Sequence, residues 1–277
     1  MVRKRKQRIA APQAGKFLID TGTAELVRDR YTPNGWLLYI NDVQSSHIDL
    51  SSKFNLDFEY MRYMAKVIES QFNPRVEQKI NFLHLGGGGC SLPRYMAYRY
   101  PAARHVVVEL DTKLIDFVRS WFDLPSAPQM RLRAGEAREV VESLSENSRD
   151  VIIRDVFAGP VTPRELLTIE FVSHVKRVLR PGGLYLINCG DGPKHSSVKA
   201  EIAALLANFT NVSVISDSAM LKGKRYGNIV LVASDAKIGS PSLGRMLRTD
   251  PIPAQLWGTG KAKEFIEGVQ YLEDLDL

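Results

Sequence analysis

Several features that mark common protein classes are scarce or missing in this chain of 277 residues. Its two cysteines, Cys90 and Cys189, are too few for a disulfide framework, and no Cys/His pairing predicts a zinc site. No stretch approaches the roughly 20 consecutive apolar residues of a membrane helix, and no apolar run follows the charged N-terminus as in a secretory signal. A nucleophile elbow and a glycine–lysine phosphate loop are also missing. We therefore expect a cytoplasmic protein without a metal or a membrane span.

The net charge of +6 is concentrated near the N-terminus. Five of the 37 basic residues lie in the first eight positions: Arg3, Lys4, Arg5, Lys6 and Arg8. Without them, 37 minus 5 leaves 32 basic residues against 31 acidic residues. A basic cluster at a chain end is typical of a solvated, flexible arm. Contact with an anionic partner such as RNA, polyphosphate or a membrane surface is the alternative. We assign residues 1–14 to this arm and expect a nearly neutral folded body.

The hydrophobic pattern changes near residue 55. Before that point, short apolar runs at 17–19, 24–27 and 36–40 are separated by turn sequences, which predicts a small antiparallel β-domain over residues 15–54. From Asp57 to Phe72 the apolar residues are spaced by three and four, which indicates a helix with Asp57 at its start.

Strands and helices then alternate through a predicted domain at residues 55–236. Strands are expected at 80–85, 106–110, 130–133, 151–155, 183–189, 212–215 and 228–232, and helices at 93–100, 114–122, 165–179 and 197–209. Nearly continuous apolar strands between helices indicate an α/β fold with a doubly wound, mainly parallel sheet covered on both faces. Residues 237–277 are expected to form an irregular tail that ends in one short helix.

Ligands bind such a sheet beyond the carboxyl ends of its strands. The first predicted strand of this domain runs into a glycine turn that precedes a helix and consists of Gly86, Gly87, Gly88 and Gly89. At such a turn the backbone can approach a ligand closely. Taken alone, these glycines fit either a nucleoside site or a tight turn without a ligand. Glu109 ends the next strand and is suited to accept both hydroxyls of a ribose, whereas Asp111 fits a helix cap. Together these features predict a nucleoside site.

Two further strand ends complete the predicted site. After the third strand come Gly135, Glu136 and Ala137, where the carboxylate is placed to accept a hydrogen bond from an adenine amino group. After the fourth strand comes Asp155. Because no second glycine fingerprint or pyrophosphate-binding set is present, the pattern indicates a methyltransferase-type sheet rather than a dinucleotide dehydrogenase. The expected ligand is an adenosyl thioether or sulfonium.

These residues together resemble the spermidine synthases, or polyamine aminopropyltransferases. The resemblance covers roughly residues 36–232 and follows the family's order through these segments: Leu38 to Ser46, Phe58 to Arg62, the turn at Gly86, Val108 to Asp111, Gly135 to Ala137, Asp155, and Arg180 to Gly183. It implies a small N-terminal β-domain on a Rossmann-like, methyltransferase-type sheet, and a homodimer.

The resemblance also implies roles for individual residues. Gln44, Glu109 and Glu136 would hold the methylthioadenosine part of decarboxylated S-adenosylmethionine, with Glu109 on the ribose and Glu136 near the adenine. The neighbouring Leu110, Ala137 and Gly135 belong to the same nucleoside site. Asp155 matches the catalytic aspartate, and Tyr60 matches a tyrosine of the amine pocket. Asp191 and Tyr226 are further candidates for the acceptor pocket, although Asp191 also fits a simple turn.

Departures from the family pattern cluster on the amine side. An aspartate of the glycine turn is here Gly89, a second aspartate after the fourth strand is Ala158, and a His-Glu pair is Met61 and Arg62. Paired carboxylates suit a diammonium substrate because an unpaired buried charge is costly. Arg62 and Arg154 either attract the carboxylate of ordinary S-adenosylmethionine or are surface arginines.

Three functions remain open. The first is aminopropyl transfer from decarboxylated S-adenosylmethionine to an altered small-molecule amine acceptor. The second is S-adenosylmethionine-dependent methyl transfer, and the third is a non-catalytic homologue that keeps the fold and acts as a binding or assembly protein.

Overall fold

The computed structural model describes residues 12–159 and 161–277. The basic cluster between Arg3 and Arg8 therefore lies outside the described residues, together with most of the predicted arm.

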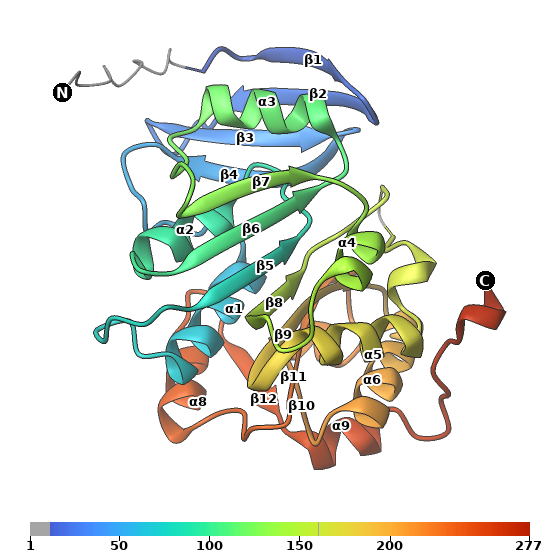
Figure 1. The fold of residues 1–277 in the computed structure, drawn as a ribbon. Helices are drawn as coiled ribbons and strands as arrows, with labels where there is room; N and C mark the ends of the chain where they lie inside the picture. Colours follow the sequence, from blue (N-terminus) through green and yellow to red (C-terminus); the bar gives the residue numbers. More distant parts are fainter. Residues whose placement is uncertain (1–11, 160) are drawn as a thin grey trace.

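The N-terminal part forms a four-stranded antiparallel sheet at the top of Figure 1. Its strands follow one another in space in chain order: β1 (Gly15–Ile19), β2 (Gly22–Arg28), β3 (Gly35–Ile40) and β4 (Val43–Asp49). β4 carries no apolar run that predicts a strand, because it begins with polar residues. It is formed through a two-residue turn in which Asn41 and Asp42 have φ of 49° and 63°, as a tight hairpin requires.

The larger sheet has eight strands within the described residues, in the order β12-β10-β11-β9-β8-β5-β6-β7. Five neighbours pair in parallel: β5 (Asn81–Leu85), β6 (Arg104–Glu109), β7 (Met130–Ala134), β8 (Arg149–Arg154) and β9 (Leu179–Asp191). Antiparallel pairing adds β10 (Asn211–Asp217), β11 (Gly227–Ser234) and β12 (Ala254–Trp257). The chain leaves β5 toward β6 and later returns to its other side as β8. The expected α/β fold is confirmed, with a topological switch point between β5 and β8.

Helices cover both faces of this sheet (Figure 1). One face packs against α1 (Glu59–Gln71), α2 (Ser91–Arg99) and α8 (Pro241–Arg248). The other packs against α4 (Ala137–Ser143), α5 (Ile169–Val178), α6 (Ser196–Asn208) and α9 (Thr259–Phe265). Short helical turns complete the set: η1 (Arg164–Leu166), α7 (Ser218–Leu221) and η2 (Asp274–Asp276). Asp57 does not start α1, because Phe58 is the N-cap residue.

The prediction of an irregular C-terminal tail with one short helix is wrong. This segment contains α8, β12, α9 and η2, and β12 is the edge strand of the large sheet, paired with β10. The Ser240 hydroxyl accepts a hydrogen bond from the backbone N–H of Leu243 at the start of α8, and Pro241 occupies the first turn, where proline is tolerated. β12 has only four residues beside Pro251 and Pro253, too short a run to predict a strand.

Asp111 joins the small sheet to the rest of the molecule. One of its oxygens accepts hydrogen bonds from the backbone N–H and the hydroxyl of Thr21, at 2.7 and 2.9 Å, in the turn between β1 and β2. The other accepts from the N–H of Leu114 and thereby caps α3 (Thr112–Trp121), as expected. α3 in turn packs between β1 and β7. The small sheet is thus fixed beside the carboxyl ends of the parallel strands.

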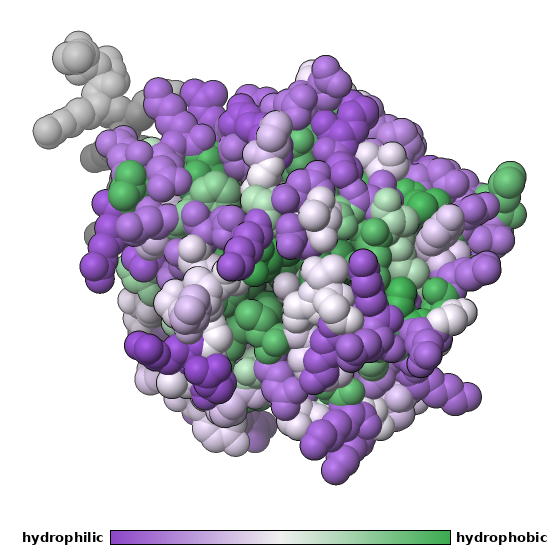
Figure 2. Space-filling view, turned by 90° about the horizontal axis from the view of Figure 1, so that it is seen from below, coloured by the Kyte–Doolittle hydropathy of each residue, from purple (hydrophilic) through white to green (hydrophobic). Residues whose placement is uncertain are grey.

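Figure 2 shows the lower face of the molecule as hydrophilic, broken by groups of hydrophobic side chains toward its centre. No helix among the described residues is both long enough and apolar enough to span a bilayer.

Candidate active site

A cavity of about 950 Å³ lies at the switch point between β5 and β8. Its walls come from the carboxyl ends of the parallel strands and from β4 of the small sheet. The volume is at the upper end of what small-molecule sites enclose, so a nucleoside and a second small compound fit together. Twelve predicted site residues line it: Gln44, Tyr60, Gly86, Gly87, Gly88, Glu109, Leu110, Glu136, Ala137, Asp155, Asp191 and Tyr226.

The glycine turn holds the carboxylate of Glu109 in place. The backbone N–H groups of Gly87 and Gly88 both donate to its Oε2 at 3.0 Å, and the N–H of Asp111 donates to Oε1 at 3.2 Å. A carboxylate has about four acceptor positions, so Glu109 keeps the capacity to accept ribose hydroxyls. Gly86 has φ of 89°, and a Cβ there would lie 2.0 Å from the carbonyl oxygen of Asp155. Only glycine lets these two strand ends approach so closely.

Gly89 and Gly135 do not line the cavity, in contrast to the expectation. The N–H of Gly89 donates to the hydroxyl of Ser46 on β4 at 2.8 Å, and a Cβ at Gly89 would lie 2.8 Å from the Cβ of Ser46. The fourth glycine is therefore packed against the small sheet. Gly135 forms the bend before α4, where φ is 157°.

Glu136 lines the cavity and also caps α4. Its Oε2 accepts a hydrogen bond of 2.8 Å from the N–H of Glu139, which leaves Oε1 without a partner from the described residues. The structure thus places this carboxylate at the cavity wall with one oxygen engaged in a cap.

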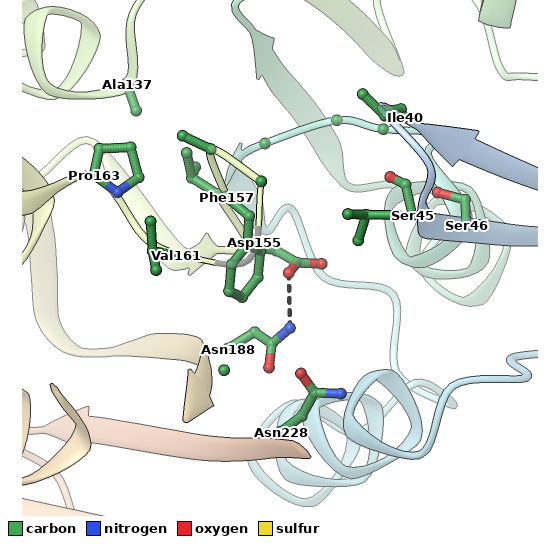
Figure 3. Close-up of a pocket in the computed structure, with 18 of the residues that line it drawn as sticks. Ile40, Ser45, Ser46, Ala137, Asp155, Phe157, Val161, Pro163, Asn188 and Asn228 are labelled. Atoms are coloured by element: carbon green, nitrogen blue, oxygen red, sulfur yellow. Dashed lines mark hydrogen bonds between the residues drawn. The ribbon is translucent and has the colours of Figure 1, made fainter. Parts of the chain in front are cut away.

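Asp155 stands at the end of β8, between two hydrogen-bond donors. The hydroxyl of Tyr60 donates to its Oδ2 and the side-chain amide of Asn188 to its Oδ1, both at 2.9 Å. Figure 3 shows the bond from Asn188. Burial raises the pKa of Asp155 above its ordinary value, and the two hydrogen bonds and the charge of Arg154 partly oppose that shift. Burial, followed by the charge of Asp155, raises the pKa of Tyr60 well above its ordinary value, so its hydroxyl stays protonated. A carboxylate with a raised pKa beside a ligand cavity suits general-base chemistry.

Asp191 and Tyr226 lie on the cavity wall in more limited roles. The two oxygens of Asp191 accept from the backbone N–H groups of Gly192 and Val198, at 2.7 and 2.9 Å, so this carboxylate fixes a turn and the start of α6. Tyr226 is 78% exposed at the rim, and its ring packs closely over Gly192.

Neither arginine is placed to bind a ligand carboxylate. Arg62 pairs with the buried Asp250 at 2.9 Å, on the side of α1 that faces α8. Arg154 is fully buried, pairs with Glu201 of α6 and donates to the carbonyl of Leu166 at 2.5 Å. Neither residue lines the cavity, and the expectation of a surface position for Arg154 is wrong as well.

The cavity is acidic. No Lys or Arg among the described residues lines it. Five carboxylates do: Glu109, Glu136, Asp155, Glu165 and Asp191. His84 adds no positive charge, because its Nε2 lies 3.1 Å from the Nδ1 of His105 and burial lowers the pKa of His84 well below its ordinary value. Burial lowers the pKa of His105 to about 3. The site therefore attracts cations.

Several wall residues escape prediction from the sequence. Asn188 lies three residues before the end of β9, and its polar side chain after an apolar run is the only local signal. Ser45 and Ser46 belong to β4, whose existence the pattern does not indicate. Figure 3 shows these serines on one side of the cavity and Phe157, Val161 and Pro163 together on the other.

A sequence model of the spermine/spermidine synthase domain matches residues 59–215. The chain belongs to this family. The matched segment runs from the start of α1 into β10 and includes Asp155, Asn188, Glu109 and the glycine turn. The family membership confirms the resemblance drawn from the sequence.

Individual members of the spermine/spermidine synthase family and more distant relatives are also similar. The crystal structure of a probable spermidine synthase from Corynebacterium glutamicum ATCC 13032 is 43% identical and superimposes with a TM-score of 0.90, covering 95% of this chain and 97% of that one. A polyamine aminopropyltransferase of Vibrio vulnificus (strain CMCP6) is 27% identical over 150 residues, 53% of this chain and 49% of that protein. An eEF1A lysine and N-terminal methyltransferase of Danio rerio is 30% identical over 133 residues, 44% of this chain and 19% of that protein. The chain thus matches about half the length of the Vibrio protein.

Proposed function

We propose that the protein is an aminopropyltransferase that takes decarboxylated S-adenosylmethionine as donor and an amine as acceptor. The acidic cavity, which no Lys or Arg of the described residues lines, is the observation that carries this proposal. Decarboxylated S-adenosylmethionine brings a sulfonium and an ammonium, both of which the carboxylates attract. The tail of S-adenosylmethionine also carries a carboxylate, which would lie among like charges with no Lys or Arg among the described cavity residues to offset it.

The donor would lie across the glycine turn. Glu109, fixed by the N–H groups of Gly87 and Gly88, would accept the ribose hydroxyls. Glu136 at the start of α4 would accept the adenine amino group through the oxygen that the cap leaves free. Gln44, Leu110 and Ala137 border the same end of the cavity. This assignment follows the family resemblance and agrees with the positions of these side chains.

Asp155 would act on the acceptor. The carboxylate takes a proton from the acceptor ammonium, and the freed nitrogen lone pair attacks the aminopropyl carbon bonded to the sulfonium sulfur. The carbon–sulfur bond breaks, its electron pair remains on sulfur, and methylthioadenosine leaves as a neutral thioether. The product is the N-aminopropyl ammonium, and Asp155 returns its proton to water. Tyr60 and Asn188 hold the carboxylate in one orientation throughout.

Parallel calorimetric titrations with decarboxylated S-adenosylmethionine, S-adenosylmethionine and methylthioadenosine test the proposal. We expect the decarboxylated donor to bind at least about tenfold more tightly than S-adenosylmethionine, since the two differ by one carboxylate in an acidic site. Equal or tighter binding of S-adenosylmethionine would favour methyl transfer, the activity in the name of the Danio rerio relative. If none of the three binds, the site is vestigial and the protein is a non-catalytic interaction protein.

The Asp155→Asn variant separates catalysis from binding. Asparagine cannot take the proton, so methylthioadenosine release should fall by about 10²- to 10⁴-fold, while the donor affinity measured by calorimetry stays within a few-fold. Unchanged release in this variant would show that Asp155 is not the base.

A further inference from the structure

The acceptor end of the cavity holds little negative charge. Glu109 and Glu136 belong to the nucleoside end, and Glu165 lies on η1, which packs against α4 at that same end. Of the five carboxylates, only Asp155 and Asp191 remain near the reacting centre. The two oxygens of Asp191 accept backbone N–H groups of its own turn and of the start of α6, so the positive end of that helix already offsets part of its charge. Asp155 has two neutral side-chain donors as partners and is therefore the carboxylate at this end that is best placed to meet an incoming ammonium.

Asn188 supplies a second acceptor at the same point. Its side chain is 2% exposed, and while its amide nitrogen donates to Asp155, its Oδ1 is buried without a partner among the described residues. A buried carbonyl oxygen without a donor costs free energy, which an N–H of a ligand would recover. Asp155 and Asn188 Oδ1 together offer acceptors for the N–H groups of one ammonium.

The surroundings of this pair are apolar or uncharged. Phe58 and Met61 at the start of α1 and Phe157 on the loop after β8 line the cavity beside it, and Asn228 on β11 is neutral. The ring of Phe58 stacks on that of Tyr60 with centroids 5.8 Å apart. Figure 3 shows Phe157 beside Asp155, with Asn188 and Asn228 below. A second ammonium placed here would lose its hydration, and the described residues offer it no carboxylate other than Asp191, whose charge the start of α6 partly offsets.

We propose that the acceptor is a monoamine with one ammonium and an uncharged, apolar body, rather than a diamine or polyamine. The inference rests on the proposed function and narrows its acceptor class. The single ammonium lies between Asp155 and Asn188 Oδ1, and the body lies against the aromatic side chains at the start of α1 and on the loop after β8.

Matched amines of equal chain length test this inference. With decarboxylated S-adenosylmethionine as donor, methylthioadenosine release is measured with n-butylamine against putrescine and with n-pentylamine against cadaverine. We expect kcat/KM for each monoamine to exceed that for its diamine by at least about tenfold, because the second ammonium lacks a full counter-charge. A diamine that matches or exceeds its monoamine overturns the inference but leaves aminopropyl transfer intact.

Ala158 offers a complementary variant. It is exposed on the loop after β8 and lines the cavity, and its backbone N–H bonds to the carbonyl of Val161, a bond that a new side chain does not remove. Ala158→Asp adds a carboxylate and should reduce the monoamine preference by at least about tenfold by raising kcat/KM for the diamines. Ala158→Asn adds nearly the same volume without charge and should keep the preference. Equal effects of Asp and Asn would contradict the charge argument.

Titration of n-pentylamine and cadaverine into protein saturated with methylthioadenosine gives a readout that needs no turnover. We expect the monoamine to bind more tightly here as well. If methylthioadenosine binds but no amine causes its release from the donor, the proposed function fails and the inference fails with it. Release with diamines alone contradicts the inference only.

Discussion

At the scale of single residues, the state of Asp155 is a balance of opposing effects. Burial is the largest and raises the pKa of the carboxyl group, whereas the hydrogen bonds from Asn188 and Tyr60 and the charge of Arg154 lower it. A general base works only when deprotonated, so these partners decide at which pH activity is lost. The two donors thus have a chemical consequence beyond fixing the orientation of the carboxylate.

Tyr60→Phe should shift the acid limb of the activity profile to higher pH. The change removes the hydroxyl that donates to Asp155 at 2.9 Å, and burial is then opposed by one hydrogen bond fewer, so the pKa of the aspartate rises. The measurement is kcat/KM for the amine as a function of pH at saturating donor.

Tyr63→Phe is the matched control for this prediction. It removes a hydroxyl from the same helix, but that hydroxyl donates to the carbonyl of Ile252 and does not line the cavity. The control should leave the pH profile in place, and an equal shift in both variants would mean that altered packing of α1, not the lost hydrogen bond, moves the pKa.

At the scale of elements, β4 and the glycine turn form one packed unit. Ser46 accepts the N–H of Gly89, and its side chain fills the space where a Cβ at Gly89 would stand. Gly89→Asp should therefore lower the free energy of unfolding by roughly 1–3 kcal/mol through overpacking. Chemical denaturation of this variant measures the loss.

A double-mutant cycle identifies the cause. Ser46→Gly removes the atoms that a Cβ at Gly89 would meet, so the double variant should be more stable than the sum of the two single changes predicts. Strict additivity would place the strain elsewhere in the turn.

The elements differ in how much their sequence reveals. The parallel core is predictable because strands such as β5 and β8 have apolar, buried centres and are followed by the glycines and by Asp155. β4 and β12 are not predictable in this way. β4 begins with polar residues, and β12 has only four residues between turns. The site follows the same division. Glu109 and Asp155 stand at strand ends, where the fold brings ligand residues, but the partner Asn188 and the contact of Ser46 with Gly89 depend on tertiary packing.

A buried ion pair joins β8 to α6, and its loss is the second prediction at this scale. Arg154, which precedes Asp155 in the chain, forms a buried ion pair with Glu201. Glu201→Gln keeps the shape but leaves the guanidinium without its counter-charge, and should lower the free energy of unfolding by about 3–5 kcal/mol. Lys16→Gln breaks the exposed pair with Glu25 and should change it by less than about 1 kcal/mol. Similar losses of unfolding free energy in both variants would contradict the argument that a buried ion pair contributes more to stability than an exposed one.

At the scale of the whole molecule, the cavity is shared by the two sheets. Gln44 and Ser45 of β4 face the strand ends that carry Glu109 and Asp155, and the turn at Thr21 is fixed to Asp111 beside them. A ligand in this cavity contacts both sheets at once. Its binding energy therefore stabilises their arrangement as well as each part.

Hydrogen exchange with methylthioadenosine tests this coupling. At a ligand concentration 100 times Kd, binding to the folded state alone should add about 2.7 kcal/mol to the free energy of unfolding. We expect slower amide exchange in β4 as well as in the turn from β5 to α2, because both border the cavity. Amides of α8, which contributes no cavity residue, report global stabilisation alone and serve as the internal reference. If the glycine turn is protected more than α8 but β4 is protected only as much as α8, the small sheet does not take part in binding the nucleoside.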